Sequence, residues 1–180
     1  MIYSYSECLT KYDSPYKLKR AVEDSSIFKI EDGIYSDEES PSSLEVIMKK
    51  YPNAILCGEY AFYAHDLTDV VPDQYSIATK SKAARINDPR VFQVYMRDDI
   101  LPLGCITKEI EGVEVRIYDK ERMLIELLRN KNVMPRDLYK EILLSYRKIV
   151  FDLDIRRIQE YIKVFPKSKM IKKAFSEEVL

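Results

Sequence analysis

The chain has 180 residues, of which 46% are hydrophobic and 33% are charged. This composition is typical of a folded globular protein and excludes a disordered one, and the length suits one domain with a small addition. A formal net charge of −1 excludes a general attraction to nucleic acid or to an anionic membrane, so nucleic-acid binding requires a local basic patch. No apolar run approaches the roughly 20 residues that span a bilayer, and the N-terminus has no secretory signal pattern.

Three cysteines, Cys8, Cys57 and Cys105, lie far apart in the sequence. Their odd number and their spacing fit neither a disulfide framework nor a set of metal ligands. We therefore expect reduced thiols in a cytoplasmic protein, without a metal site or another cofactor.

Residues 1–36 predict a small unit of two helices and a two-stranded ribbon. A short helix is expected over residues 6–12, and a second begins at Pro15, with Ser14 as its cap. The segment IFKIEDGIYS, residues 27–36, places the turn-forming sequence Glu-Asp-Gly between two short strands. This order is that of a winged helix-turn-helix whose first helix is missing.

The segment SDEESPSS, residues 36–43, is rich in acidic residues, serine and proline and predicts a hinge. It separates the partial winged helix-turn-helix unit, residues 1–36, from a larger domain, residues 43–180. The predicted fold class is α+β, with a mixed β-sheet covered by helices and a helical C-terminus. In the larger domain, strands are expected at 54–58, 74–79, 91–96, 105–110 and 113–118, and helices at 43–51, 58–67, 120–130, 135–146 and 154–162.

The only histidine, His65, lies in the segment LCGEYAFYAHDLTD. A catalytic imidazole needs a partner that orients it, and a metal site needs several ligands. Asp66 and Asp69 are near in sequence, but a His–Asp pair alone is a weak signal, and the small neighbouring residues suit close packing. We interpret His65 as a structural residue, with catalysis as the less supported alternative, and we predict no catalytic residue.

An enzyme is the least supported class of function. The four glycines form no phosphate-binding loop. The segment VEVRIYDKE is only faintly similar to a metal-dependent nuclease, because Glu114, Asp119 and Lys120 lack the close acid–lysine spacing of such a site. A nuclease or a nucleotide-handling enzyme would need carboxylates brought together from distant segments.

The second predicted helix and the ribbon carry the candidate DNA-binding residues. In a winged helix this helix enters the major groove, where arginine reads guanine and lysine and tyrosine meet phosphates. Six acidic side chains in residues 1–36 balance these cations, so a solvated surface helix is the alternative. The candidate DNA-binding residues are Ser14, Tyr16, Lys17, Lys19, Arg20 and Lys29.

A second basic cluster near the C-terminus offers another surface for nucleic acid, with a solvated helical tail as the alternative. Its candidate residues are Arg156, Arg157, Lys163, Lys169, Lys172 and Lys173.

Three blocks, in the same order, resemble the AbiEi family, the antitoxins of AbiE-type (type IV) abortive-infection toxin–antitoxin systems. The first, SPYKLKRAVEDSSIFKIEDGIYS, resembles the end of the family's winged helix. The second is AILCGEYAFYAHDLTDVVPDQYSIATK, where Asp66 stands at a position at which the family commonly has glycine. The third, VEVRIYDKERMLIELLRN, is similar to the family's strand followed by a Glu-Arg-apolar-apolar helix. The matching positions of the last two blocks are Gly58, Glu59, Ala61, Ala64, His65, Leu67, Thr68, Pro72, Glu121, Arg122, Met123 and Leu124.

The resemblance implies a transcriptional autoregulator of a phage-defence system, whose N-terminal unit binds inverted repeats in operator DNA upstream of its own operon. It also implies that the larger domain counteracts a nucleotidyltransferase-type toxin without a stable complex, and that His65 belongs to a structural helix. An alternative from another class is a protein-interaction module with a vestigial winged helix. The shortened, acid-balanced N-terminus favours that alternative.

Overall fold

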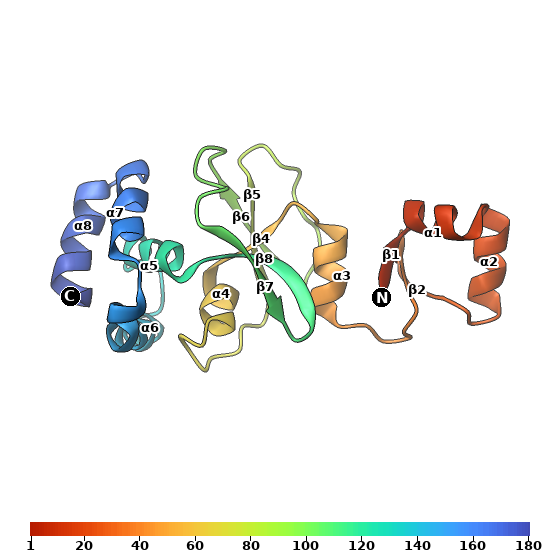
Figure 1. Cartoon of the computed structure of the whole chain (residues 1–180), viewed down its shortest axis with the longest axis horizontal. Helices are drawn as coiled ribbons and strands as arrows, with labels where there is room; N and C mark the ends of the chain where they lie inside the picture. The colour runs from red at the N-terminus through yellow and green to blue at the C-terminus, as the bar shows by residue number, and fades with distance from the viewer. The chain divides into compact units, whose positions relative to one another are not determined.

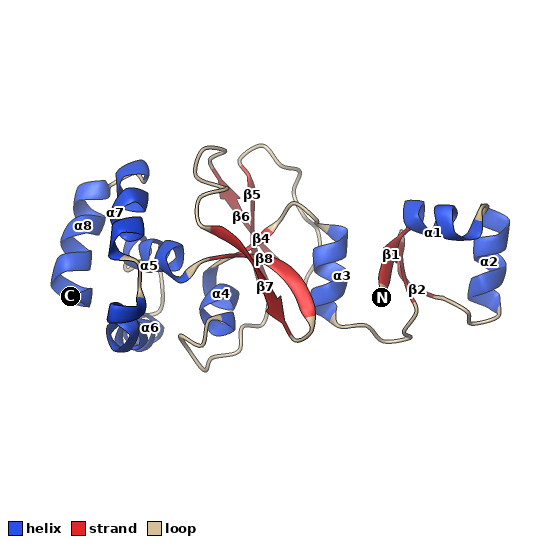
Figure 2. Ribbon diagram, in the orientation of Figure 1, coloured by secondary structure: helices blue, strands red, loops and turns tan.

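The computed structural model describes residues 1–180, the whole chain. The chain contains eight α-helices and eight strands and divides into two compact units, residues 1–53 and residues 54–180 (Figures 1 and 2). The α+β class predicted from the sequence is confirmed. None of the helices combines the length and the apolar character that crossing a membrane requires.

The first unit contains a three-stranded antiparallel sheet, with the strand order β1-β3-β2. Two helices lie between β1 and β2 in the sequence, and a third follows β3. The elements are β1 Ile2–Ser4, α1 Tyr5–Tyr12, α2 Pro15–Glu23, β2 Phe28–Glu31, β3 Ile34–Ser36 and α3 Ser43–Lys50.

Strand β1 was missed by the sequence analysis because three residues give no readable alternation. It forms by pairing with β3, a contact that is distant in sequence. Its last residue, Ser4, then caps α1: the Glu7 backbone N–H donates to Ser4 Oγ at 3.3 Å, and the Ser4 N–H donates to Glu7 Oε2 at 2.6 Å. This capping box starts α1 at Tyr5, one residue earlier than expected.

Helix α2 begins as predicted, with Ser14 as its cap and Pro15 at its first position. The Lys17 backbone N–H donates to Ser14 Oγ at 3.3 Å. The face of α2 that carries Leu18 and Ala21 is buried together with Cys8, Ile27 and Tyr35. This cluster is the core on one side of the small sheet.

The other side of the small sheet is covered by α3. Ile2 and Ile34 are buried here with Val46 of α3. Adjacent residues of a strand point to opposite faces, so Ile34 meets α3 whereas Tyr35 meets the core beneath α1 and α2. Helix α3 therefore belongs to the first unit, although the sequence analysis placed residues from 43 onward in the larger domain. Its cap is Ser42, whose hydroxyl oxygen accepts from the Glu45 backbone N–H.

The second unit is built on a five-stranded mixed sheet with the order β6-β5-β4-β8-β7. The pairs β4–β8 and β5–β6 are parallel, and the pairs β4–β5 and β7–β8 are antiparallel. The mixed sheet predicted from the sequence is confirmed. The strands are β4 Ile55–Leu56, β5 Tyr75–Lys80, β6 Val91–Met96, β7 Cys105–Ile110 and β8 Val113–Tyr118.

Helices cover the sheet of the second unit and form its C-terminal half. Helix α4 packs against β5 and α5, and α5 in turn contacts α6, α7 and α8. Figure 1 shows the last four helices gathered beside the sheet. The helices are α4 Gly58–Ala64, α5 Lys120–Arg129, α6 Arg136–Ile149, α7 Ile155–Val164 and α8 Ser168–Ala174, with a 3-10 turn at Val150–Asp152 and a π-helical turn at Phe175–Val179.

Replacing Ile34 by alanine should lower the stability of the first unit by about 2 to 5 kcal/mol, because it leaves a cavity between β3 and α3. Hydrogen–deuterium exchange of the amides of residues 1–53 measures the change. Val133, whose side chain is 85% exposed, provides the control, and Val133→Ala should cost less than about 0.5 kcal/mol. An Ile34→Ala protein with unchanged protection in residues 1–53 would contradict the packing of α3 on this sheet.

Candidate functional sites

The predicted DNA-binding side chains of α2 lie on its exposed face. Tyr16, Lys17, Lys19 and Arg20 are all exposed, and Tyr16 is 69% accessible. Ser14 is used locally, since its hydroxyl oxygen accepts the backbone N–H that starts the helix. The exposed α2 face thus presents one aromatic and three basic side chains.

The basic side chains of this surface are mostly paired with nearby carboxylates. Exposed ion pairs of this kind contribute only about 0 to 1 kcal/mol, so a phosphate group can replace the carboxylate at little cost. The Arg20 side chain forms no hydrogen bond and no ion pair, and Asp24 is the carboxylate with which its charge interacts. The three pairs are Lys17 Nζ with Asp13 at 3.1 Å, Lys19 Nζ with Glu23 at 3.8 Å and Lys29 Nζ with Asp32 at 2.7 Å.

The first unit as a whole is acidic. Residues 1–53 carry ten Asp or Glu and seven Lys or Arg side chains. A duplex would therefore meet an attractive patch only at α2 and the β2–β3 hairpin, which limits the number of phosphates that the unit can neutralise.

The six residues of the C-terminal basic cluster are all exposed. Arg156 and Lys163 are one heptad apart on α7, and neither forms an ion pair. Lys169 and Lys172 on α8 also form none. Three of the lysines line one shallow depression with Ser176 and Glu177, namely Lys169, Lys172 and Lys173. Two members are paired: Arg157 with Asp119 at 3.5 Å, and Lys173 with Glu177 at 3.8 Å.

His65 is buried at the C-terminal end of α4, with 4% of its surface exposed. Its Nε2 lies 2.7 Å from the Tyr118 carbonyl oxygen, so Nε2 carries the proton and donates it. Burial lowers the pKa of the imidazole, and the hydrogen bond to the carbonyl opposes this effect only in part. His65 is thus packed and hydrogen-bonded within the second unit.

The two carboxylates considered for a nuclease site, Asp119 and Glu114, lie in different surroundings. Asp119 is 5% exposed and caps α5, accepting from the Arg122 backbone N–H at 2.7 Å and from the Tyr161 hydroxyl at 2.8 Å. Burial raises the pKa of Asp119. Glu114 is exposed on β8 opposite Glu109 of β7. No three His, Cys, Asp or Glu side chains are grouped so as to hold a metal ion.

Arg122 of α5 is fully buried. The sequence analysis did not predict this burial. Arg122 Nη2 donates to Glu126 Oε1 at 2.8 Å, and the guanidinium lies 4.6 Å from the ring centre of Tyr118 and 4.0 Å from that of Phe165. The Nε and Nη1 groups have no hydrogen-bond partner. Glu126 is also paired with Arg129 at 3.0 Å. The helical spacing of Arg122 and Glu126 signals a pair, but it does not distinguish a buried pair from an exposed one.

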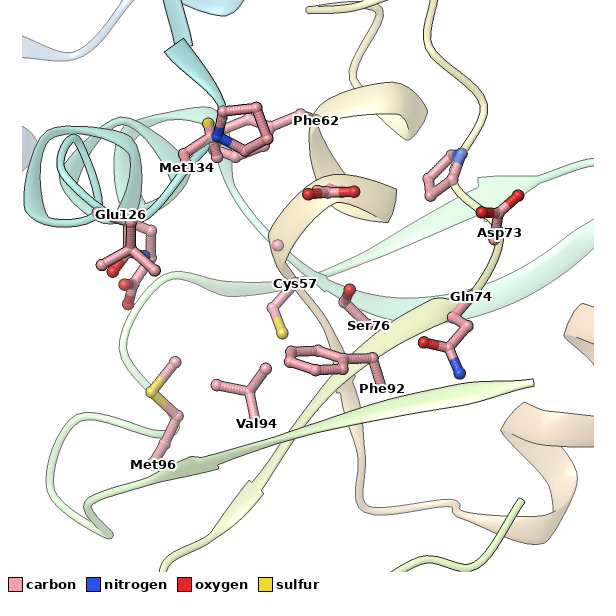
Figure 3. Close-up of a pocket in the computed structure, with 16 residues that line it drawn as sticks. Cys57, Phe62, Asp73, Gln74, Ser76, Phe92, Val94, Met96, Glu126 and Met134 are labelled. Atoms are coloured by element: carbon pink, nitrogen blue, oxygen red, sulfur yellow. The ribbon is translucent and has the colours of Figure 1, made fainter. Parts of the chain in front are cut away.

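A cavity of about 550 Å³ opens in the second unit beside α4, β5 and β6, a volume typical of ligand sites. Figure 3 shows Phe92, Val94 and Met96 projecting from one strand towards Cys57 and Ser76. Other lining residues are Glu59, Phe62, Pro72, Asp73, Gln74, Glu126, Val133 and Met134. The sequence analysis did not predict this cavity, because its walls come from four separate segments.

Two features shape the floor of this cavity. Gly58 has φ of +55°, and a Cβ atom there would lie 3.1 Å from Ser76 Cβ, so glycine permits the close approach of α4 to β5. Burial raises the pKa of the Cys57 thiol far above its usual range. The thiol therefore stays protonated and contributes an apolar surface rather than a nucleophile.

The comparisons with known proteins indicate a fold and no more. No protein-family model matches the sequence, and no curated protein matches it. A crystal structure of the RV2827C protein from Mycobacterium tuberculosis superposes with a TM-score of 0.63, covering 98% of this chain and 71% of that chain at 12% identity. The chain shares its fold with that protein.

The buried imidazole should make stability depend on pH. The folded-state pKa of His65 is lowered from 6.5, so the unfolded chain binds a proton that the folded chain resists, and stability falls as the pH drops below about 6.5. Urea unfolding at about pH 7.5 and about pH 5 should show a smaller loss for His65→Gln than for the wild type. Equal losses in the two proteins would show that His65 titrates in the folded state as it does in the unfolded chain.

Removing Glu126 should destabilise the protein more than removing Arg122. Glu126→Leu leaves the Arg122 guanidinium buried without its carboxylate, at a cost of about 3 to 5 kcal/mol, whereas Arg122→Met leaves Glu126 paired with Arg129. The Arg122→Met/Glu126→Leu double variant should recover most of the loss. Urea unfolding measures all three variants, and a larger loss in Arg122→Met would refute this assignment of the charges.

Proposed function

We propose that the protein is an antitoxin-like transcriptional autoregulator whose first unit binds operator DNA. The observation that carries the proposal is the exposed α2 face with Tyr16, Lys17, Lys19 and Arg20, set in the element order β1-α1-α2-β2-β3. This order matches a winged helix without its first helix. In this account α2 enters the major groove and the β2–β3 hairpin acts as the wing.

The chemistry of the exposed side chains assigns their roles. Arg20, whose side chain is not held in an ion pair, reads the O6 and N7 atoms of a guanine. Lys17, Lys19 and Lys29 exchange their carboxylate partners for phosphates, and Tyr16 donates its hydroxyl to the backbone. Such an operator is expected to contain inverted repeats. Each of the two half-sites then binds one copy of the protein.

The antitoxin role is supported by the resemblance to the AbiEi family. Asp66, at a position where that family commonly has glycine, has φ of +59°, a conformation that glycine adopts without strain. Two of the residues that carry the resemblance, His65 and Arg122, are buried. Their burial supports a role in maintaining the fold. The partner to be counteracted is a nucleotidyltransferase-type toxin, without a stable complex, and the free thiols of Cys8, Cys57 and Cys105 suit the cytoplasm.

The acidic balance of the first unit favours a second candidate, a protein-interaction module that no longer binds DNA. Ten acidic side chains against seven basic ones oppose the approach of a duplex except at α2 and the hairpin. DNA binding separates this candidate from the first one.

Fluorescence anisotropy of a labelled duplex from upstream of the gene tests the proposal. The duplex should bind more tightly than a scrambled one, and the affinity should fall with salt with a log–log slope of about −3, for about three phosphate contacts. The Lys17→Ala/Lys19→Ala/Arg20→Ala variant should lose the preference and most of the slope. Co-expression with the neighbouring toxin tests the antitoxin role separately.

A second triple variant, Lys163→Ala/Lys169→Ala/Lys172→Ala, removes the same charge from the C-terminal surface and serves as the matched control. It should bind the upstream duplex as the wild type does. An equal loss of affinity in both triple variants would show that DNA binding depends on the total positive charge and not on α2. The absence of any preference over the scrambled duplex would leave the interaction module as the function.

A further inference from the structure

The cavity of the second unit has an apolar floor and an exposed apolar rim. Phe92 is 57% exposed and Val133 is 85% exposed, although both line the cavity. Large apolar side chains left in water beside a concave surface are typical of binding sites. All residues that line the cavity belong to the second unit, and none of them is proposed to meet DNA.

One wall of the cavity is formed by an edge strand that lacks the usual protection. Strand β6 lies at one edge of the sheet, and its six residues, VFQVYM, include no charge, proline or glycine. The opposite edge strand, β7, carries Lys108 and Glu109. Natural edge strands commonly carry charges that prevent pairing with other chains. The unprotected edge of β6 can therefore accept a further strand.

The side chains of β6 connect this edge to the cavity. Phe92, Val94 and Met96 alternate along the strand and all line the cavity (Figure 3). A segment added alongside β6 presents every second side chain to the same face of the sheet. One such side chain enters the cavity while the backbone of the segment pairs with β6.

The charges at the cavity favour a cation. Glu59 and Asp73 are exposed and line the cavity, and their carboxylates have no hydrogen bond or ion pair within the chain. Glu126, the third carboxylate of the lining, is already paired with two arginines. A long side chain with an apolar stem and a cationic end fits an apolar floor with two unpaired carboxylates.

We propose that this cavity and β6 bind an extended segment of another protein, with an arginine of that segment seated in the cavity. The backbone of the segment pairs with β6. The aliphatic stem and the guanidinium plane of the arginine pack on Phe92, and its N–H groups donate to Glu59 and Asp73. This site goes beyond DNA binding by the first unit and does not depend on it.

Selection from a displayed library of random decapeptides with the full-length protein tests the proposal. The enriched peptides should share an arginine flanked by β-branched residues. For one such peptide, anisotropy should give at least ten-fold weaker binding when the arginine is replaced by citrulline, its neutral isostere. Methylation of alternate backbone amides on the pairing edge should abolish binding.

Variants of the protein distinguish binding at this cavity from attraction by the negative charge of the protein as a whole. Glu59→Gln/Asp73→Asn should weaken binding at least ten-fold, and Phe92→Lys should do so by charging the edge. The matched control, Glu109→Gln/Glu114→Gln, removes two carboxylates from the β7–β8 hairpin and should bind as the wild type does. The Lys17→Ala/Lys19→Ala/Arg20→Ala variant should also bind the peptide normally, so failure here is distinct from failure of DNA binding.

Three results would overturn the proposal. One is enrichment of peptides without a shared arginine, and another is equal peptide binding by the wild type and Glu59→Gln/Asp73→Asn. The third is a dimer in sedimentation that Phe92→Lys disrupts, together with no selected peptide, which would assign the edge to a second copy of this chain.

Discussion

The second unit depends on one buried charge, the guanidinium of Arg122. Its Nη2 lies 2.8 Å from Glu126 Oε1, and the guanidinium lies over the ring of Tyr118 and over that of Phe165. Tyr118 ends β8, the last strand in chain order, and Phe165 follows α7, so a single side chain of α5 joins the sheet to the C-terminal helices. Burying this ion costs several kcal/mol, which its carboxylate and the two rings offset only if their geometry is kept.

This constraint extends to the residues around the guanidinium. Gly104 has φ of +74°, and a Cβ atom there would lie 2.6 Å from Arg122 Cβ, so no other residue fits without displacing α5. Glu126 faces Arg122 and also lines the cavity, which ties the shape of the proposed peptide site to the buried ion pair. The two proposed interaction surfaces thus differ in kind. Helix α2 presents exposed charges on a small unit, whereas the cavity borders the buried ion pair of Arg122 and Glu126.

The sequence predicts regular elements well where a local signal exists. The predicted limits of β6, β7 and β8 agree with the structure, and the cap of α2, Ser14, is where the pattern places it. The hairpin between β7 and β8 follows from Glu111-Gly112, both of which have positive φ.

The features that could not be predicted from the sequence depend on contacts between distant segments. Strand β1 exists because β3 pairs with it, α3 joins the first unit through Val46, and the burial of Arg122 needs Phe165 from 43 residues away in the chain. The cavity is likewise assembled from separate segments. The basic residues of α2 were predicted to be exposed and are so, but their ion pairs with neighbouring carboxylates were not foreseen.

The central claim is that operator DNA is read by α2 and the β2–β3 hairpin of the first unit. Backbone amide chemical shifts of the full-length protein, recorded while the upstream duplex is added, test it most directly. The account predicts changes concentrated in residues 14–36, with residues 155–174 unaffected. Changes concentrated in α7 and α8, or none beyond those caused by a scrambled duplex, would contradict it.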